Sequence, residues 1–333
     1  MSTTNTHASR GDPSHGGATP ASSASSAGAA IDVEHLVKAY GSTVAVNGLS
    51  FAVQPGEIFA LLGPNGAGKT TTVEILEGYR VADGGSARVL GLDPRRDAAQ
   101  LKPRVGVMLQ QDGLYQALRA REILDLYASF YASPEDPREL MERVGLSGVA
   151  STRFRQLSGG QKRRLALAVA IVGKPRLLFL DEPTTGMDPQ ARRATWDIIQ
   201  EQKARGVTVL LTTHFMDEAE RLADRIAIMD GGKLIALDTP SGLTTSQSTT
   251  GTEVRFHAQP GLDVVALGRL GAVRSAREES PGVYALDTGE PRELLVQLST
   301  HLRDAGVDVT ELRVGRSTLE DVFIRLTGKE MRE

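Results

Sequence analysis

The chain has 333 residues, of which 24% are charged and 40% are hydrophobic, and its formal net charge is −3. A small negative charge with interspersed acidic and basic residues gives no basic stripe for nucleic acid, and the absence of cysteine excludes disulfides and thiolate metal sites. No stretch approaches the roughly 18 continuous apolar residues of a membrane-spanning helix, and the N-terminus lacks the apolar core of a secretory signal. We therefore expect the chain alone to stay in the cytosol and to reach a membrane only through a partner.

The N-terminal part of the chain divides into a polar leader and a folded domain. Residues 1–29 are almost entirely Ser, Thr, Ala, Gly, His and Pro, with too little apolar surface to offset the entropy of ordering, so they predict a disordered tail. Residues 30–242 alternate short apolar strands with helices, a pattern typical of a parallel sheet covered on both faces. The predicted strands are 31–36, 50–53, 57–62, 176–180, 207–211 and 225–229, and the predicted helices are about 69–77, 161–172, 189–204 and 216–223. The stretch from about 101 to 156 predicts a mainly helical subdomain.

A second, smaller unit follows a polar segment. Residues 243–252 are rich in Thr and Ser and predict a linker, and residues 253–333 predict an α/β accessory domain. Its expected strands are 253–258, 282–286 and 308–314, and its expected helices are 261–270, 291–305 and 317–327. Ser317 and Glu320 have the spacing of a capping box at the start of the last helix.

A glycine-rich loop after an apolar strand carries the strongest chemical signal. It fits the pattern G-x-x-x-x-G-K-[ST] and consists of Gly63, Pro64, Asn65, Gly66, Ala67, Gly68, Lys69, Thr70 and Thr71. Its backbone N–H groups and the following helix N-terminus form an anion site. Lys69 is expected to reach the β- and γ-phosphates of a nucleotide, and the Thr70 hydroxyl to ligate Mg²⁺.

Two carboxylates end a second apolar strand. Asp181 and Glu182 follow a Leu-Leu-Phe-Leu run, at the edge where ligands collect in open α/β sheets. We expect Asp181 to hold Mg²⁺, usually through water, and Glu182 to act as the general base that activates the attacking water.

Another glycine-rich helix start lies at Ser158, Gly159, Gly160 and Gln161, after Leu157. It is a second anion site by the same physics. One chain has no evident need for two phosphate-binding sites for one nucleotide, so we expect this second site to bind a nucleotide held by another subunit.

These motifs, LSGGQ about twenty residues before LLFLDEP and after GPNGAGKT, resemble the ATP-binding cassette (ABC) proteins over residues 31–240. The resemblance implies a P-loop NTPase cassette, with a RecA-like core and a helical subdomain, that binds ATP and Mg²⁺ and works as a homodimer. It implies that Tyr40 stacks on adenine, that Gln110 contacts Mg²⁺ and the attacking water, and that Asp188 crosses the dimer interface. Gln111, next to Gln110, is an alternative for that glutamine. His214 is implied to contact the γ-phosphate.

The amino-acid sequence around the motifs resembles, more narrowly, the ATPase subunits of type-2 ABC exporters of the daunorubicin/doxorubicin-resistance kind. The C-terminal run LEDVFIRLTG, covering Leu319 to Gly328, resembles the end of their accessory domain. Such subunits lie on the cytoplasmic side of the membrane, pair with a separate integral-membrane permease and bind no nucleic acid. Among Leu114, Tyr115, Tyr127, Phe130 and Tyr131, some are expected in a permease-binding groove and others in the core. An importer ATPase, or a soluble ABC ATPase acting on nucleic acid or ribosomes, remains an alternative. By analogy with those subunits the cargo is a drug or antibiotic, and it would contact the permease rather than this chain.

Overall fold

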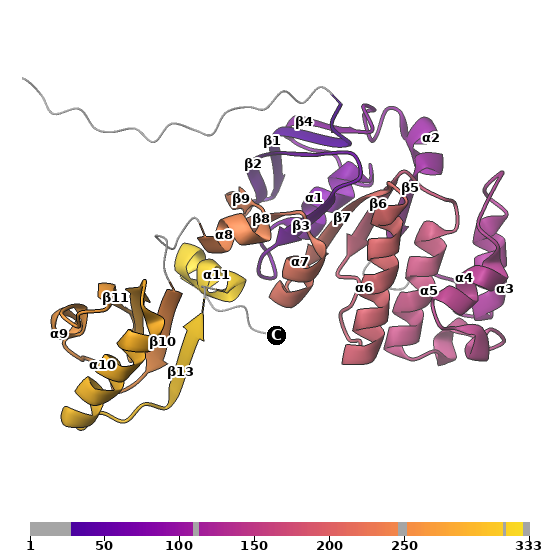
Figure 1. Cartoon of the computed structure of the whole chain (residues 1–333). Helices are drawn as coiled ribbons and strands as arrows, with labels where there is room; N and C mark the ends of the chain where they lie inside the picture. The colour runs from indigo at the N-terminus through magenta and orange to yellow at the C-terminus, as the bar shows by residue number, and fades with distance from the viewer. Residues whose placement is uncertain (1–27, 109–112, 246–251, 316–317, 329–333) are drawn as a thin grey trace, which may run out of the picture.

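The computed structural model describes residues 28–108, 113–245, 252–315 and 318–328. Most of the expected tail, residues 1–27, lies outside the described residues. Within them the chain forms three sheets with helices packed around them (Figure 1). The mixed α/β fold class expected from the strand and helix pattern is confirmed.

A six-stranded sheet forms the centre of the larger domain. Its strand order is β5-β6-β7-β3-β8-β9, parallel except for the antiparallel pair β8 and β9. The strands are β3 (Ile58–Leu62), β5 (Val105–Met108), β6 (Leu177–Asp181), β7 (Thr208–Thr213), β8 (Arg225–Asp230) and β9 (Lys233–Asp238). Alternate residues of β3 enter different hydrophobic clusters: Ile58 and Leu62 lie in one and Phe59 and Leu61 in the other. Both faces are therefore buried, because successive side chains of a strand point to opposite faces.

One face of the central sheet is covered by a small antiparallel sheet of order β2-β1-β4, made of β1 (Ile31–Tyr40), β2 (Thr43–Val53) and β4 (Gly84–Val89). Its buried residues, such as Ile31 and Val46, share a hydrophobic cluster with Phe59. The expected strands at 31–36 and 50–53 are confirmed as parts of β1 and β2, and β4 was not predicted.

Helices pack on the central sheet and form the region after β5. They are α1 (Lys69–Leu76), α2 (Ala98–Leu101), α3 (Ala120–Ala128), α4 (Pro137–Arg143), α5 (Gly159–Ile171), α6 (Pro189–Ala204) and α7 (Met216–Leu222), with 3-10 turns η1 (Lys102–Arg104), η2 (Ser147–Val149) and η3 (Phe154–Gln156). The prediction of a mainly helical stretch from about 101 was wrong for β5, which pairs in parallel with β6. This strand depends on Gly106, because a Cβ there would lie 1.9 Å from the Ala170 carbonyl oxygen of α5.

The accessory unit is a four-stranded antiparallel sheet of order β11-β12-β10-β13 with its own hydrophobic cluster. Its elements are β10 (Thr252–His257), α9 (Val264–Gly268), β11 (Val273–Ser280), β12 (Val283–Thr288), α10 (Pro291–Asp304) and β13 (Glu311–Gly315). The helix expected at 261–270 is shorter, and β11 was not predicted because its many charged residues hide the alternation of a strand.

Two further helices join the units. Helix α8 (Pro240–Thr245) takes up the start of the expected linker and buries Leu243 in the larger domain. Helix α11 (Leu319–Thr327) begins at Thr318, whose capping box is with Asp321. The expected pairing of Ser317 with Glu320 was wrong by one residue, and Ser317 itself lies outside the described residues. The division into a domain over 30–242, a linker over 243–252 and a domain over 253–333 stays a prediction.

Candidate active site

The predicted site residues come from three neighbouring strands of the central sheet and the loops that follow them. Asp181 ends β6 in register with Thr212 of β7, and Leu62 ends β3 in register with Thr213. Parallel strands end at the same edge, so the loops after β3, β6 and β7 meet there. The sheet thereby brings together residues more than a hundred positions apart in the sequence.

The phosphate loop connects β3 to α1 by a backbone that glycine permits. Gly66 and Gly68 have φ of 82° and 96°, in the left-handed region, and Gly68 is the N-cap of α1. A Cβ at Gly63 would lie 2.4 Å from the Met229 carbonyl oxygen. Glycine is therefore required where the loop passes β8.

Lys69 is held inside this loop. Only 5% of the residue is exposed, and its Nζ donates to the carbonyl oxygens of Gly63 at 2.7 Å and Pro64 at 3.2 Å. Burial lowers the pKa of Lys69, while the nearby carboxylates of Glu182 and Asp181 raise it. A buried ammonium group needs hydrogen-bond acceptors and negative charge around it, and an anionic ligand bound in the loop would supply more of both.

Asp181 lies between two hydroxyl groups. Its Oδ1 accepts a short hydrogen bond from Thr212 Oγ1, and its Oδ2 lies 3.4 Å from Thr70 Oγ1. Burial raises the pKa of Asp181, and the hydrogen bond from Thr212 lowers it in part. Two hard oxygen donors, the carboxylate of Asp181 and the hydroxyl of Thr70, are thus adjacent, and these are ligands that Mg²⁺ prefers.

Glu182 has a backbone that few residues other than glycine adopt. Its φ is 48°, and its N–H is shared between the carbonyl oxygen of Thr212 and the Thr212 hydroxyl, both at 3.1 Å. The carboxylate accepts from Thr185 Oγ1 at 3.2 Å and lies 3.1 Å from His214 Nδ1. Strained backbones of this kind cluster at functional sites. The structure therefore brings together Glu182 and His214, which the sequence separates by 32 positions.

Two further residues of this cluster were not predicted. Thr212 contacts both Asp181 and Glu182, and Arg163 of α5 donates to the Asp181 carbonyl oxygen at 3.4 Å. Burial lowers the pKa of Arg163, against the opposing effect of Glu182 and Asp181. A sequence signal existed for Thr212, since it lies two residues before His214, near the end of β7. No local pattern marks Arg163, whose position depends on how α5 packs.

The second glycine-rich helix start is organised within itself. Ser158 is the N-cap of α5, its Oγ accepts from Gln161 N at 3.3 Å, and Gln161 Oε1 accepts from Ser158 N at 2.9 Å. Ser158 and Gly159 are exposed. The helix end therefore presents its N-terminus to solvent rather than to the phosphate loop of the same chain.

Asp188 also caps a helix. Its Oδ1 accepts from the backbone N–H groups of Ala191 at 2.9 Å and Gln190 at 3.0 Å at the start of α6. These bonds lower the pKa of Asp188. The residue is exposed, as a contact to another subunit requires.

Of the remaining predicted residues, Tyr40 ends β1 with 42% of its surface exposed. The Lys38 ammonium and the Arg80 guanidinium lie 5.5 Å and 5.4 Å from its ring centroid. Gln110 and its alternative Gln111 lie outside the described residues.

A cavity of about 620 Å³ lies between α1, β5, α3 and α5. Four of the five apolar residues singled out from the sequence line it, namely Leu114, Tyr127, Phe130 and Tyr131, and Tyr115 is 60% exposed. Glu77 is on its wall, and burial raises its pKa to about 8, with Asp181 and Glu74 adding to the effect. The cavity wall thus combines aromatic and aliphatic side chains with the cationic Lys102, Lys162 and Arg163, and the Glu77 carboxyl group on it is mostly neutral at pH 7.

Known proteins resemble this chain in sequence and in fold. The sequence profile of the ABC transporter family matches residues 46–185. The chain is 41% identical to the Nod factor export ATP-binding protein I of Paraburkholderia xenovorans (strain LB400) over 314 residues, 92% of this chain and 99% of that protein. The chain belongs to the ABC transporter family of ATP-binding proteins.

Other members of the family are similar as well. The daunorubicin/doxorubicin resistance ATP-binding protein DrrA of Streptomyces peucetius is 39% identical over 311 residues, 90% of this chain and 92% of that protein. A solved ATP binding subunit of an ABC transporter superposes with a TM-score of 0.60 and 29% identity, over 65% of this chain and 92% of that chain. This ABC protein is thus an ATPase subunit with a P-loop cassette, as its sequence predicted. Among the residues that the structure describes, no helix has the length and apolar character needed to span a bilayer.

Proposed function

We propose that this ABC ATPase hydrolyses Mg-ATP at sites shared between two copies of the chain and so powers export through a separate membrane permease. The observation that carries the proposal is the cluster of Lys69, Thr70, Asp181, Glu182 and His214 at one edge of the central sheet. It unites a cation for phosphates, oxygen donors for a metal and a carboxylate beside a histidine.

The chemistry follows from these positions. The phosphate loop binds the triphosphate through its N–H groups and Lys69. Thr70 and Asp181 would hold Mg²⁺, with Gln110 as a further ligand, and the metal would neutralise charge on the phosphates. Glu182 accepts a proton from the attacking water, and His214, 3.1 Å from it, orients that carboxylate and faces the terminal phosphate. Tyr40 stacks on adenine from the exposed end of β1.

A shared site accounts for the second helix N-terminus. Ser158, Gly159, Gly160 and Gln161 form an anion site whose first two residues are exposed, and the hydrogen bonds of its cap stay within the helix start. In a head-to-tail homodimer it would complete the partner's nucleotide site, with Asp188 at the interface. Both composite sites would be competent, because each chain carries all of the described site residues.

Export through a permease is supported by similarity that extends beyond the cassette. The relatives are named as export and drug-resistance ATP-binding proteins, and they match over about nine tenths of this chain, accessory region included. The cavity beside Tyr127, Phe130 and Tyr131 offers an apolar surface for a permease segment. We place the subunit on the cytoplasmic face of the membrane, bound through the permease, with a drug or antibiotic as the cargo by analogy and without nucleic acid as a partner.

The decisive experiment replaces the proposed base. We expect Glu182→Gln to lower kcat for ATP hydrolysis by about a hundredfold or more, while ATP still binds, because the amide cannot accept the proton. The same variant should accumulate as an ATP-bound dimer in light scattering. Hydrolysis at the normal rate would show that another group is the base, and a monomer at saturating ATP would contradict the shared site.

A further inference from the structure

The last described helix, α11, follows the accessory sheet in sequence but contributes to the core of the ATPase domain. Leu319, Val322 and Phe323 are 0% exposed and lie in the same hydrophobic cluster as Leu222 of α7 and Leu243 of α8. In Figure 1, α11 lies beside α8, between the accessory sheet and the central domain. Its apolar side is therefore buried against the catalytic domain.

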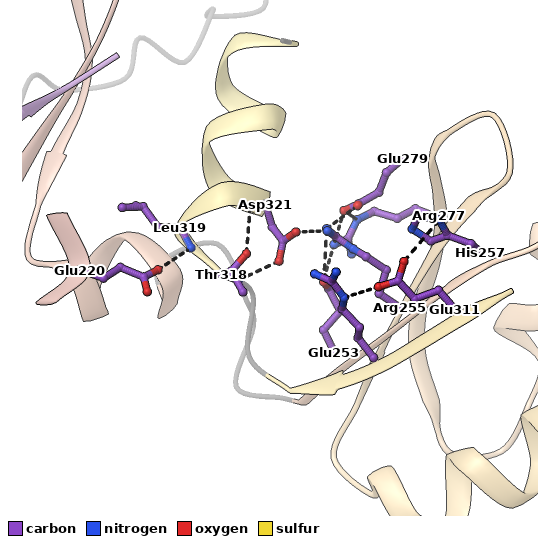
Figure 2. Close-up of polar contacts among 11 residues, drawn as sticks. Glu220, Glu253, Arg255, His257, Arg277, Glu279, Glu311, Thr318, Leu319 and Asp321 are labelled. Atoms are coloured by element: carbon purple, nitrogen blue, oxygen red, sulfur yellow. Dashed lines mark hydrogen bonds and ion pairs between the residues drawn. The ribbon is translucent and has the colours of Figure 1, made fainter. Parts of the chain in front are cut away.

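A polar contact fastens α11 to α7 at the helix start. The backbone N–H of Leu319 donates to Glu220 Oε1 of α7 at 2.9 Å (Figure 2). The first N–H groups of a helix have no partner within it, so a carboxylate that accepts one of them stabilises the start of the helix. Glu220 therefore acts as a cap supplied by another helix, 99 positions earlier in the chain.

The other side of the same turn is bound to the accessory sheet. Asp321 forms a short ion pair with Arg255 of β10, and Arg255 lies 2.5 Å from Glu279 Oε2 of β11 (Figure 2). Arg255 and Arg277 both pair with Glu253, of which only 5% of the side chain is exposed. Removing Asp321 would leave the partly buried Arg255 with the carboxylates of the accessory sheet alone, and the link from the network to α11 would be lost. The position of α11 is thus coupled to that of the sheet.

Helix α7, against which α11 packs, starts directly beside the active site. Phe215 is its N-cap, and His214, one residue earlier, contacts Glu182. Glu218 of α7 is fully buried, and its Oε1 accepts from Thr184 Oγ1 at 2.7 Å and from Trp196 Nε1 at 3.0 Å. A shift of α7 would therefore move the histidine relative to the proposed base and disturb Trp196.

We propose that α11 is a positioning element for ATP hydrolysis: docked on α7, it holds His214 against Glu182, and through Asp321 it ties this docking to the accessory sheet. The proposal rests on the proposed roles of Glu182 and His214. It makes Glu220, Phe323 and Asp321 positioning residues, since none of them touches the nucleotide-binding cluster. Displacement of the accessory sheet would loosen α11 and slow hydrolysis without removing any catalytic group.

The test compares Glu220→Ala and Asp321→Ala with Glu320→Ala as the matched control. Glu320 is an exposed carboxylate of α11 next to Leu319, and the described contacts give it no bond to α7 or to the sheet. Loss of a cap shifts a docking equilibrium by about fivefold, so we expect kcat to fall by up to about fivefold in both test variants, with the KM for ATP within about twofold. Glu320→Ala should keep the parental kcat.

A second readout needs no nucleotide. Trp196 is the only tryptophan of the chain, is 7% exposed and bonds to α7, so its fluorescence emission reports on the position of this helix. We expect a red shift in Glu220→Ala and Asp321→Ala but not in Glu320→Ala. Equal emission in all three variants, or a red shift with unchanged kcat, would overturn the proposal.

Phe323→Ala tests the apolar contact, and we expect a larger fall in kcat and a larger red shift of the Trp196 emission than in the other variants. If circular dichroism shows that Phe323→Ala is unfolded, the surface variant Glu220→Ala decides. Glu182→Gln measured in parallel separates the two proposals, because Trp196 emission tests the docking of α11 even if Glu182 is not the base.

Discussion

Thr212 offers a sharp test of how the site is held together. Its hydroxyl is fully buried, donates to Asp181 Oδ1 and lies 3.1 Å from the Glu182 N–H. Thr212→Val keeps the shape and removes both contacts. A hydrogen bond to a charged group is worth about 1.5–3 kcal/mol, so we expect a stability loss of about that size and a fall in kcat of at least about tenfold. The Glu182 N–H keeps its bond to the Thr212 carbonyl oxygen, so the backbone turn survives.

The same substitution has a pH signature. Burial raises the pKa of Asp181, and the bond from Thr212 opposes that rise, so valine should raise the pKa further. In the protein without nucleotide and metal, a higher pH is then needed to ionise Asp181 in the variant than in the parent. A carboxyl group whose pKa is higher in the folded than in the unfolded protein stabilises the fold at low pH. That stability is lost as the pH rises from the unfolded-state pKa through the folded-state pKa. The stability gap between variant and parent should therefore widen as pH rises above about 4.

The assay is urea unfolding of the protein without nucleotide and metal across a range of pH, with kcat for ATP hydrolysis measured at one pH. Thr208→Val is the matched control: Thr208 is also buried in β7, and its Oγ1 accepts from Gly56 N at 2.9 Å at the far end of the strand. It should lose stability but keep its kcat and the pH profile of its stability. If the two valine variants show the same pH profile of stability, Thr212 does not control Asp181 and the reasoning is refuted.

Two further outcomes are expected. Burial raises the pKa of Glu77 to about 8, so its ionisation lowers the stability of the fold progressively from about pH 4.5 to about 8. In urea unfolding, Glu77→Gln should match the stability of the parent near pH 4 and exceed it above pH 8. Equal stability at high pH would contradict the burial of this carboxyl group. Ser158→Arg should abolish ATP-driven dimerisation, because a bulky cation replaces the cap of the exposed helix start. Gel filtration with ATP measures the dimer, with Arg153→Ala as a control outside the helix start. A dimer that persists in Ser158→Arg would reject the shared-site model.

Local sequence determined the parts of this protein that depend on neighbouring residues. The loop from Gly63 to Thr71 was predictable because its glycines, lysine and helix start are contiguous, and the helix 189–204 because proline and Asp188 mark its beginning. The acid pair after β6 was predictable because a buried strand has a recognisable apolar run and a definite end. Resemblance to ABC proteins added His214 and Tyr40, whose chemistry no local pattern reveals.

Only the tertiary structure decided what depends on pairing across the chain. The strand β5 has four residues, too few for a periodic pattern, and its identity follows from pairing with β6 and from the close approach of α5 at Gly106. The bond from Thr212 to Asp181 follows from the register of β6 and β7, which no single strand specifies. The apolar stripe of Leu319, Val322 and Phe323 was visible in the sequence, but its partner was not, because burial of apolar area is non-directional and any complementary surface would satisfy it. The fold placed that stripe against α7 and α8 of the ATPase domain.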